Sequence, residues 1–212
     1  LRPLFLLTAK PALYIANVEE HGFVDNPLLE KVKAYAAKEG APVAKLIAKS
    51  ASDGLLPLTI GGLSLTDATP ARITAVALYP GKEKATGTAL KKLGLDWPAA
   101  NRVASSAKTL CVWSGRAQAF LINAAPDGLD RAAALTDISD GWVALALDGM
   151  GAEAALARLI PLDLGASAFP EGASARTSLG HMQVLLHRSG AHHFTLFVFR
   201  SMIKTAVHEI ET

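Results

Sequence analysis

The chain has 212 residues, which predicts one domain of moderate size or two small ones. Half of the residues are hydrophobic and only 19% are charged, whereas about a quarter is typical of soluble domains. This composition favours a globular subunit that covers part of its surface with partners; the alternative is an alanine-rich monomer. The net charge of +2, without a basic run or an acidic tail, gives no indication of nucleic-acid binding.

The single cysteine and the chain's hydrophobic segments bear on its cellular setting. Cys111 has no partner for an internal disulfide. It lies in a strand-like run, 109–113, which favours a buried structural thiol over a nucleophile. No segment is long enough for a transmembrane helix, and residues 1–7 are too short for a signal core. We therefore expect a cytoplasmic protein without membrane contact.

Residues 11–47 follow a strand–helix–strand pattern. Residues 11–16 are apolar and predict a strand. Asn26 and Pro27 are typical of a helix start, with Asn as cap and Pro at the first helical position, and Gly40 is placed to end the helix. The apolar stripe of this helix consists of Leu28, Val32, Tyr35 and Ala36. Residues 42–47 predict a second strand, and 48–70 predict a loop with a few extended residues.

From residue 73 onward, a β-α-β-β-α pattern occurs twice. The first unit comprises a strand at 73–79, a helix at 82–93, two strands at 109–113 and 118–122, and a helix at 127–134. The second comprises a central strand at 142–147, a helix at 152–160, a loop at 161–176, a half-exposed strand at 182–186, a strand at 194–199 and a final helix capped by Ser201. The sequence thus predicts an α+β fold of two pseudo-duplicated units, with almost no residue identity between them.

The sequence contains none of the common catalytic motifs. It lacks a phosphate loop, a dinucleotide fingerprint, C-x-x-C, H-E-x-x-H and G-x-S-x-G. The residues therefore indicate no self-contained catalytic constellation.

The histidines are better explained as surface or loop residues than as metal ligands. His192 and His193 are adjacent, so on a strand they point to opposite faces. His181 and His187 lie about 20 Å apart at the rise of an extended strand, too far for shared ligation. His208 is expected near the end of the final helix, where the helix dipole favours a cation.

Two groups of polar residues have both a functional and a structural interpretation. Asp137, Ser139 and Asp140 could perform acid–base chemistry, but such a stretch more often turns the chain and caps local amides. Arg176 and Arg200 could each clamp a carboxylate, or form a structural or intersubunit ion pair.

Several separated blocks resemble the sarcosine oxidase gamma subunit family, in the order in which that family has them. The blocks are ALTDISDGW (134–142), LARLIPLDL (156–164) with Phe169-Pro170, ARTSLGHM (175–182) and VFRSM (198–202). Upstream, DGLLPLTIG (53–61) is similar to the start of one branch of the family. The resemblance covers residues 44–212.

This resemblance implies a fold, a complex and a role. The fold would be similar to the folate-binding aminomethyltransferase domain. The complex would contain alpha, beta, gamma and delta subunits and demethylate sarcosine to glycine, with peroxide and 5,10-methylenetetrahydrofolate as products. FAD, FMN, NAD, tetrahydrofolate and zinc would belong to the partner subunits, and this chain would carry no cofactor and no catalytic residue. Ligand or interface positions would be Asp137, Ser139, Arg176, His181 and Arg200.

An alternative is a folate-binding module in its own right. In that case Asp137, Arg176 and Arg200 would converge on one cleft.

Residues 8–43 resemble a different family. KPALYIANVEE (10–20) and AYAAKEGAPV (34–43) are similar to the base-recognition segment of Obg-related, YchF-type P-loop ATPases. The resemblance implies that Asn17 and Glu20 read adenine. Because the phosphate loop has no counterpart here, we assign no nucleotide hydrolysis; a nucleotide-binding fragment is a further alternative. The predicted domains are therefore 1–43, an N-terminal β-α-β extension, and 44–212.

Overall fold

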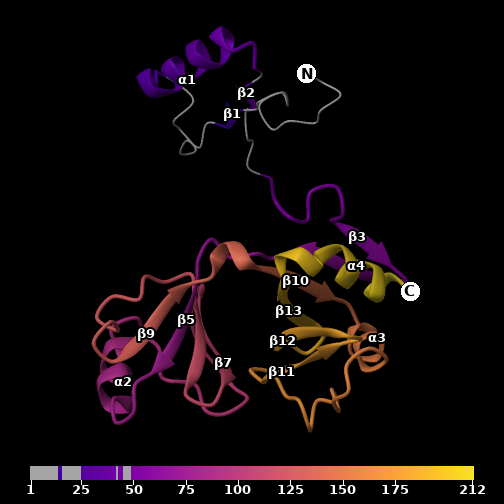
Figure 1. The fold of residues 1–212 in the computed structure, drawn as a ribbon. Helices are drawn as coiled ribbons and strands as arrows, with labels where there is room; N and C mark the ends of the chain where they lie inside the picture. The colour runs from indigo at the N-terminus through magenta and orange to yellow at the C-terminus, as the bar shows by residue number, and fades with distance from the viewer. Residues whose placement is uncertain (1–13, 16–24, 42, 45–48) are drawn as a thin grey trace. The chain divides into compact units, whose positions relative to one another are not determined.

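The computed structural model describes residues 14–15, 25–41, 43–44 and 49–212 (Figure 1). The chain divides into two compact units, an N-terminal unit of residues 1–50 and a C-terminal unit of residues 51–212. Asn17 and Glu20 lie outside the described residues.

The N-terminal unit has the predicted strand–helix–strand order. Strands β1 (Tyr14–Ile15) and β2 (Val43–Ala44) pair in parallel, and α1 (Pro27–Lys38) connects them. The Asn26 side chain accepts hydrogen bonds from the amides of Leu28 at 3.0 Å and Leu29 at 3.2 Å, which confirms the predicted cap.

The buried face of α1 differs from the predicted stripe. Leu29 and Ala36 are buried, whereas Leu28 and Tyr35 are exposed. Leu28 and Leu29 both fit a helical period of 3.6 residues with Ala36. The sequence pattern therefore does not distinguish them, and packing buries Leu29.

The C-terminal unit contains two antiparallel sheets. The six-stranded sheet has the order β11-β12-β13-β10-β4-β3, and the five-stranded sheet has the order β6-β7-β8-β5-β9. The strands of the first are β3 (Leu58–Ile60), β4 (Leu63–Asp67), β10 (Trp142–Asp148), β11 (Ser174–Leu179), β12 (Met182–Gly190) and β13 (His193–Phe199). Those of the second are β5 (Ile73–Leu78), β6 (Val103–Ser106), β7 (Thr109–Gly115), β8 (Gln118–Ile122) and β9 (Ala133–Asp137).

Helices cover the outer faces of both sheets, so that the unit has four layers in the order α-β-β-α (Figure 1). Helix α2 (Glu83–Lys91) packs on the five-stranded sheet. Helices α3 (Ala152–Ala157) and α4 (Ile203–Glu211) pack on the six-stranded sheet. Two short 3-10 turns, η3 (Ser139–Gly141) and η4 (Arg200–Met202), precede β10 and α4.

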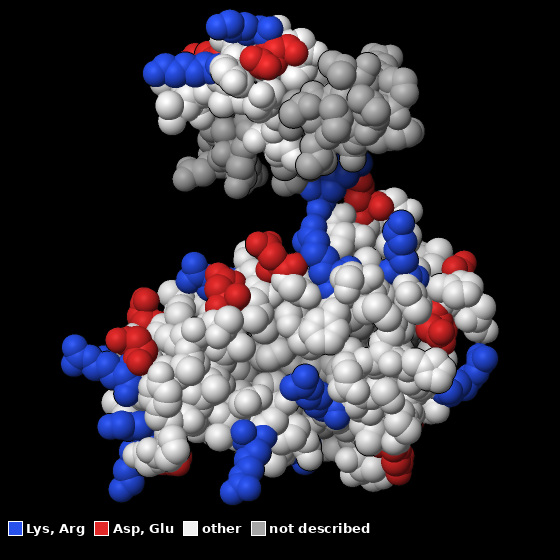
Figure 2. Space-filling model, in the orientation of Figure 1, with Lys and Arg blue, Asp and Glu red and all other residues white. Residues whose placement is uncertain are grey.

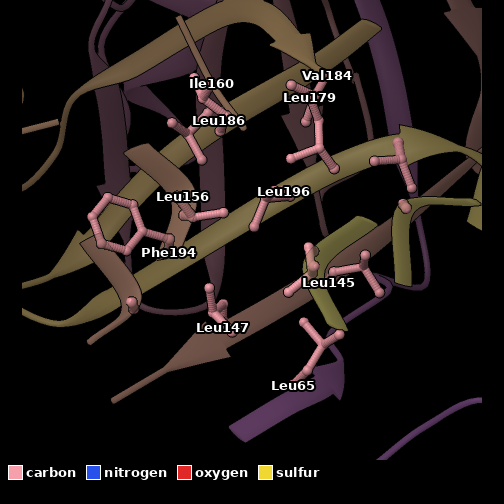
Figure 3. Packing of buried hydrophobic residues seen from close by; sticks show 14 of the residues in the cluster. Leu65, Leu145, Leu147, Leu156, Ile160, Leu179, Val184, Leu186, Phe194 and Leu196 are labelled. Carbon is pink, nitrogen blue, oxygen red and sulfur yellow. The ribbon is translucent and has the colours of Figure 1, made fainter. Parts of the chain in front are cut away.

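Each interface between layers has its own apolar core. Under α3 and α4, leucines from successive strands interdigitate with Leu156 and Ile160 (Figure 3). Between the sheets, Phe120 of β8 meets Trp142 of β10 edge to face, with 5.1 Å between ring centroids. Each fully buried leucine contributes about 1.5–3 kcal/mol to folding. The face of a strand that carries the apolar side chains therefore packs against the neighbouring layer.

The two sheets are built by reciprocal strand exchange. In each unit the chain forms a strand, a helix and three further strands: β5-α2-β6-β7-β8, then β10-α3-β11-β12-β13. The strand that precedes each β-α-β-β-β repeat joins the sheet of the other repeat. Strand β4 precedes the first repeat and pairs with β10 of the second, and β9 precedes the second repeat and pairs with β5 of the first. The predicted pseudo-duplication therefore extends to strand order, and the α+β class is confirmed.

Several predicted elements are wrong. The predicted helix at 127–134 is a set of turns leading into β9, because Gly128 adopts a φ of 76° and β9 pairs with β5. Ser201 does not cap α4, since the chain enters α4 through η4 and the N-cap position is Met202. Strand β6 was not predicted, and β11 begins inside the predicted loop.

Candidate functional site

The predicted Asp137–Ser139 segment forms a compact turn at the end of β9. The Ser139 hydroxyl donates to Asp137 Oδ1 at 2.6 Å, and the Ser139 amide donates to the same oxygen at 3.0 Å. These two bonds lower the pKa of Asp137 below its ordinary value of 3.8. Ser139 Oγ also accepts from the amide of Ile73 in β5 at 2.9 Å. The geometry thus favours the structural interpretation of this segment.

The same turn occurs a second time, at the end of β4. Asp67 Oδ1 accepts from the Thr69 amide at 2.8 Å, and Thr69 Oγ1 accepts from the amide of Ala144 in β10 at 3.2 Å. Both turns follow the tripeptide Leu-Thr-Asp, at 65–67 and 135–137. A Leu-Thr-Asp-x-Ser/Thr corner therefore precedes each of the two units, outside the residues 73–134 and 142 onward over which almost no identity was predicted.

Arg200 lies in an apolar groove at the end of β13. The groove has a volume of about 620 Å³ and includes Phe199, Arg200 and Lys204. Phe199 is 39% exposed, although its ring lies 4.4 Å from that of Trp142. This arrangement can receive an apolar side chain while Lys204 attracts a carboxylate.

Arg176 lines a different groove, beside the edge strand β11. That groove has a volume of about 530 Å³ and includes Arg102, Asp163 and Arg176. His181 is exposed in the turn between β11 and β12. The structure therefore brings Asp137 close to Ser139, but Arg176 and Arg200 line separate grooves.

Sequence reasoning missed a third depression, which we call the polar cleft. It has a volume of about 480 Å³ and lies at one end of the space between the two sheets. Its lining residues are Val103, Ser105, Leu110, Glu171, Gly172, His187, Ser189, His193 and Thr195. In the strand predicted at 182–186, Gln183 is exposed as predicted, whereas His187, expected at the surface, is only 6% exposed.

Burial determines the protonation state of His187. Its pKa is lowered below the ordinary value of 6.5, chiefly because burial disfavours the imidazolium. The hydrogen bond to the Ala173 carbonyl and the nearby Glu171 carboxylate act in the opposite direction. His187 is therefore neutral at physiological pH.

Few groups suited to chemistry are available in the described part of the chain. Cys111 is buried in the five-stranded sheet, as predicted, and burial raises the pKa of its thiol to about 12. Among the described residues, no group of three His, Cys, Asp or Glu side chains is placed to hold a metal ion. None of the described helices has the length and hydrophobicity needed to cross a membrane.

The four-layer unit defines an α+β protein whose two antiparallel sheets exchange strands. A structure with this fold is the heterotetrameric sarcosine oxidase from Corynebacterium sp. U-96 in complex with pyrrole 2-carboxylate. The match has a TM-score of 0.67 and 22% sequence identity, and covers 78% of this chain and 94% of the matched chain. At this identity, the two chains share a fold. No known protein family profile matches the sequence.

The short similarity to YchF-type ATPases is confirmed. The chain is 49% identical over 53 residues to the ribosome-binding ATPase YchF of Escherichia coli O157:H7, and 53% identical over 47 residues to that of Haemophilus influenzae. These matches cover 25% and 22% of this chain but only 15% and 13% of the relatives. The chain thus spans less than a sixth of the length of these relatives.

Proposed function

We propose that this chain is the gamma subunit of a heterotetrameric sarcosine oxidase and acts as a structural subunit beside alpha, beta and delta subunits. The observation that carries the proposal is the shared fold, which spans 94% of one chain of that enzyme. The ordered sequence blocks between residues 53 and 202 support it independently.

In this proposal the chain contributes to the assembly and its partners perform the reaction. The complex demethylates sarcosine to glycine and forms peroxide and 5,10-methylenetetrahydrofolate. Flavins, NAD, tetrahydrofolate and zinc are bound by the partner subunits. The internally bonded Asp137–Ser139 turn and the buried Cys111 thiol agree with a supporting role, since neither is placed to act as a base or a nucleophile.

The surface of the C-terminal unit suits a subunit that is covered by partners. On the face shown in Figure 2, acidic and basic side chains are interspersed, and wide uncharged areas lie between them. The groove beside Phe199 is the best candidate contact. Because Lys204 flanks it, the occupant we propose is a partner-subunit segment that pairs an apolar side chain with a carboxylate.

Co-expression of the tagged chain with the alpha, beta and delta subunits tests the proposal. We expect to recover a yellow flavoprotein complex that makes peroxide from sarcosine, whereas the chain alone binds no flavin. Lys204→Glu should weaken assembly about tenfold, because it reverses a charge at the groove. Lys108→Glu, an equal charge reversal at the exposed β6–β7 turn, is the matched control.

The result that contradicts the proposal is recovery of the folded chain without any flavoprotein subunit. Flavin bound stoichiometrically by the isolated chain would contradict the supporting role while leaving the assignment to this enzyme intact.

A further inference from the structure

The polar cleft continues the interface between the two sheets, where side chains are otherwise apolar. Alternation places Leu185 of β12 and Phe197 of β13 in the inter-sheet core. Two residues after Leu185 and two residues before Phe197, the same face presents His187 and Thr195, which pair with each other across the antiparallel strands. A sandwich core normally continues with apolar residues at such positions. The change to polar residues opens a lined cleft at this end of the interface.

The proton of His187 can be located from its hydrogen bond. Its Nδ1 lies 3.1 Å from the carbonyl oxygen of Ala173. A carbonyl oxygen only accepts, so Nδ1 carries the proton and Nε2 of the neutral ring has a lone pair. A buried imidazole that lines the cleft therefore offers an acceptor rather than a donor.

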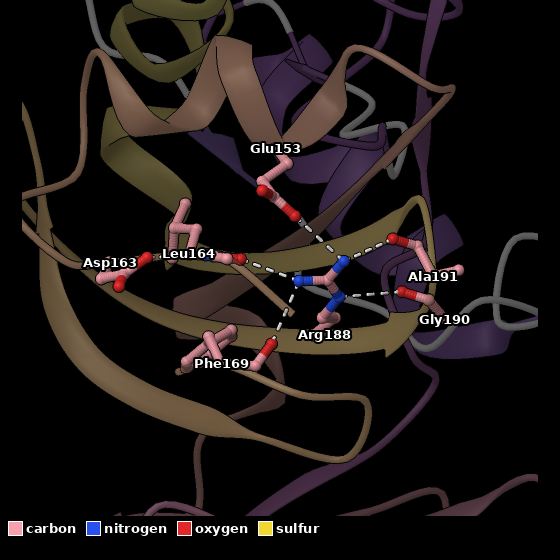
Figure 4. Close-up of polar contacts among 8 residues, drawn as sticks. Glu153, Asp163, Leu164, Phe169, Arg188, Gly190 and Ala191 are labelled. Carbon is pink, nitrogen blue, oxygen red and sulfur yellow. Dashed lines mark hydrogen bonds and ion pairs between the residues drawn. The ribbon is translucent and has the colours of Figure 1, made fainter. Parts of the chain in front are cut away.

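The walls of the cleft are held in place by Arg188, the next residue along β12 (Figure 4). Its guanidinium donates to the carbonyls of Leu164 and Phe169, which precede the segment carrying Glu171, at 2.8 and 3.1 Å. It also donates to the carbonyls of Gly190 and Ala191, in the turn between Ser189 and His193, at 3.3 and 2.6 Å. One side chain thus positions two of the segments that line the cleft.

Glu171 is the one carboxylate among the described residues that line the cleft, and none of these residues is Lys or Arg. The Arg188 guanidinium behind the walls is paired with Glu153 at 3.1 Å. His193 has its Nδ1 3.6 Å from Asp148, so a second carboxylate lies behind the lining. Val103 and Leu110 supply an apolar wall from the opposite sheet. An acceptor nitrogen, a carboxylate and an apolar wall are complementary to an amine attached to a hydrocarbon group.

We propose that the polar cleft is a binding site for a small organic amine, whose ammonium group meets Glu171 and donates to His187 Nε2 while its hydrocarbon part packs on Val103 and Leu110. The lining residues of this site all belong to this chain, so its test needs no partner subunit.

Three probes that share a benzyl group test the proposal on the full chain at neutral pH: benzylammonium, benzyl alcohol and phenylacetate. Binding is followed through the ring NMR signals of His187, assigned by comparison with His187→Asn. Benzylammonium should shift these signals saturably and bind at least about tenfold more tightly than phenylacetate, because Glu171 attracts the ammonium group and repels the carboxylate. Glu171→Gln should remove most of that preference, whereas Asp163→Asn, in the neighbouring groove, should leave it unchanged.

The proposal is overturned if phenylacetate binds as tightly as benzylammonium. It is equally overturned if none of the probes shifts the His187 signals up to about 10 mM, or if Glu171→Gln leaves the preference intact. Since folding of each variant is visible in the same spectra, loss of binding through unfolding is recognised directly.

Discussion

At the scale of single residues, Arg188 joins β12 to helix α3 and to the loop before β11. It is 4% exposed, pairs with Glu153 of α3 at 3.1 Å and lies 5.0 Å from the centre of the Phe194 ring. We expect Arg188→Lys to lower the free energy of unfolding by about 3 kcal/mol, because one ammonium cannot replace the donors of the guanidinium. Urea denaturation measures the change. Arg158→Lys, at an exposed position, should stay within about 0.5 kcal/mol.

His187 makes a prediction about pH. Its folded-state pKa lies below 6.5. Below pH 6.5, the imidazole is therefore protonated to a greater extent in the unfolded chain than in the folded chain. The contribution of His187 to the free energy of unfolding is therefore fully present above pH 6.5. It decreases as the pH falls below 6.5, by at most about 1.4 kcal/mol per pH unit. In urea titrations at several pH values, His187→Asn should flatten the slope. The exposed His181 serves as control; an equal flattening by His181→Asn would contradict the assignment.

At the scale of elements, the two Leu-Thr-Asp corners join each sheet to the strand it receives. Each corner hydroxyl accepts a hydrogen bond from a backbone amide of the adjoining sheet. Ser139 accepts from Ile73, and Thr69 accepts from Ala144. We expect Ser139→Ala and Thr69→Ala each to lower the free energy of unfolding by about 1–3 kcal/mol, because a strand amide loses its acceptor.

The same measurement has a matched control in Ser201→Ala. Ser201 is exposed, so its loss should change stability by less than about 0.5 kcal/mol. Ser139→Ala should also raise the pKa of Asp137 toward 3.8 in a carboxyl NMR titration. An unchanged Asp137 pKa would show that the turn does not persist in solution.

At the scale of the whole molecule, the three apolar cores lie entirely within residues 51–212. A chain shortened to begin at Ala51 should therefore unfold cooperatively at an unchanged midpoint of the C-terminal transition. A chain that begins at Ile73 should be strongly destabilised, because β4 supplies Leu63 and Leu65 to the core and covers one side of β10. Thermal unfolding followed by circular dichroism distinguishes the two.

Much of the fold could be predicted because local signals agreed with the final packing. The strands at 142–147 and 194–199 are apolar on both faces, and both became central strands. The cap at Asn26 needs only local geometry. The helix expected at 127–134 is wrong because β9 pairs with β5, whose paired residues lie 55 to 63 positions upstream, and a local pattern does not contain that partner. Among the candidate site residues that the structure describes, Asp137 and Ser139 are joined by a hydrogen bond, which neighbours in sequence can form locally. Contact between η3, which carries Ser139, and η4, which carries Arg200, arises only in the folded unit.

The sequence by itself determined the α+β class, the two successive units and the burial of Cys111, because alternation and helical periodicity record which side chains avoid water. The tertiary structure decided the strand exchange, the separation of Arg176 from Arg200, and the burial of His187 in a polar cleft. These depend on which strands pair across long distances. Pairing register and sheet–sheet contact are set by the packing of the whole unit, so no local pattern contains them.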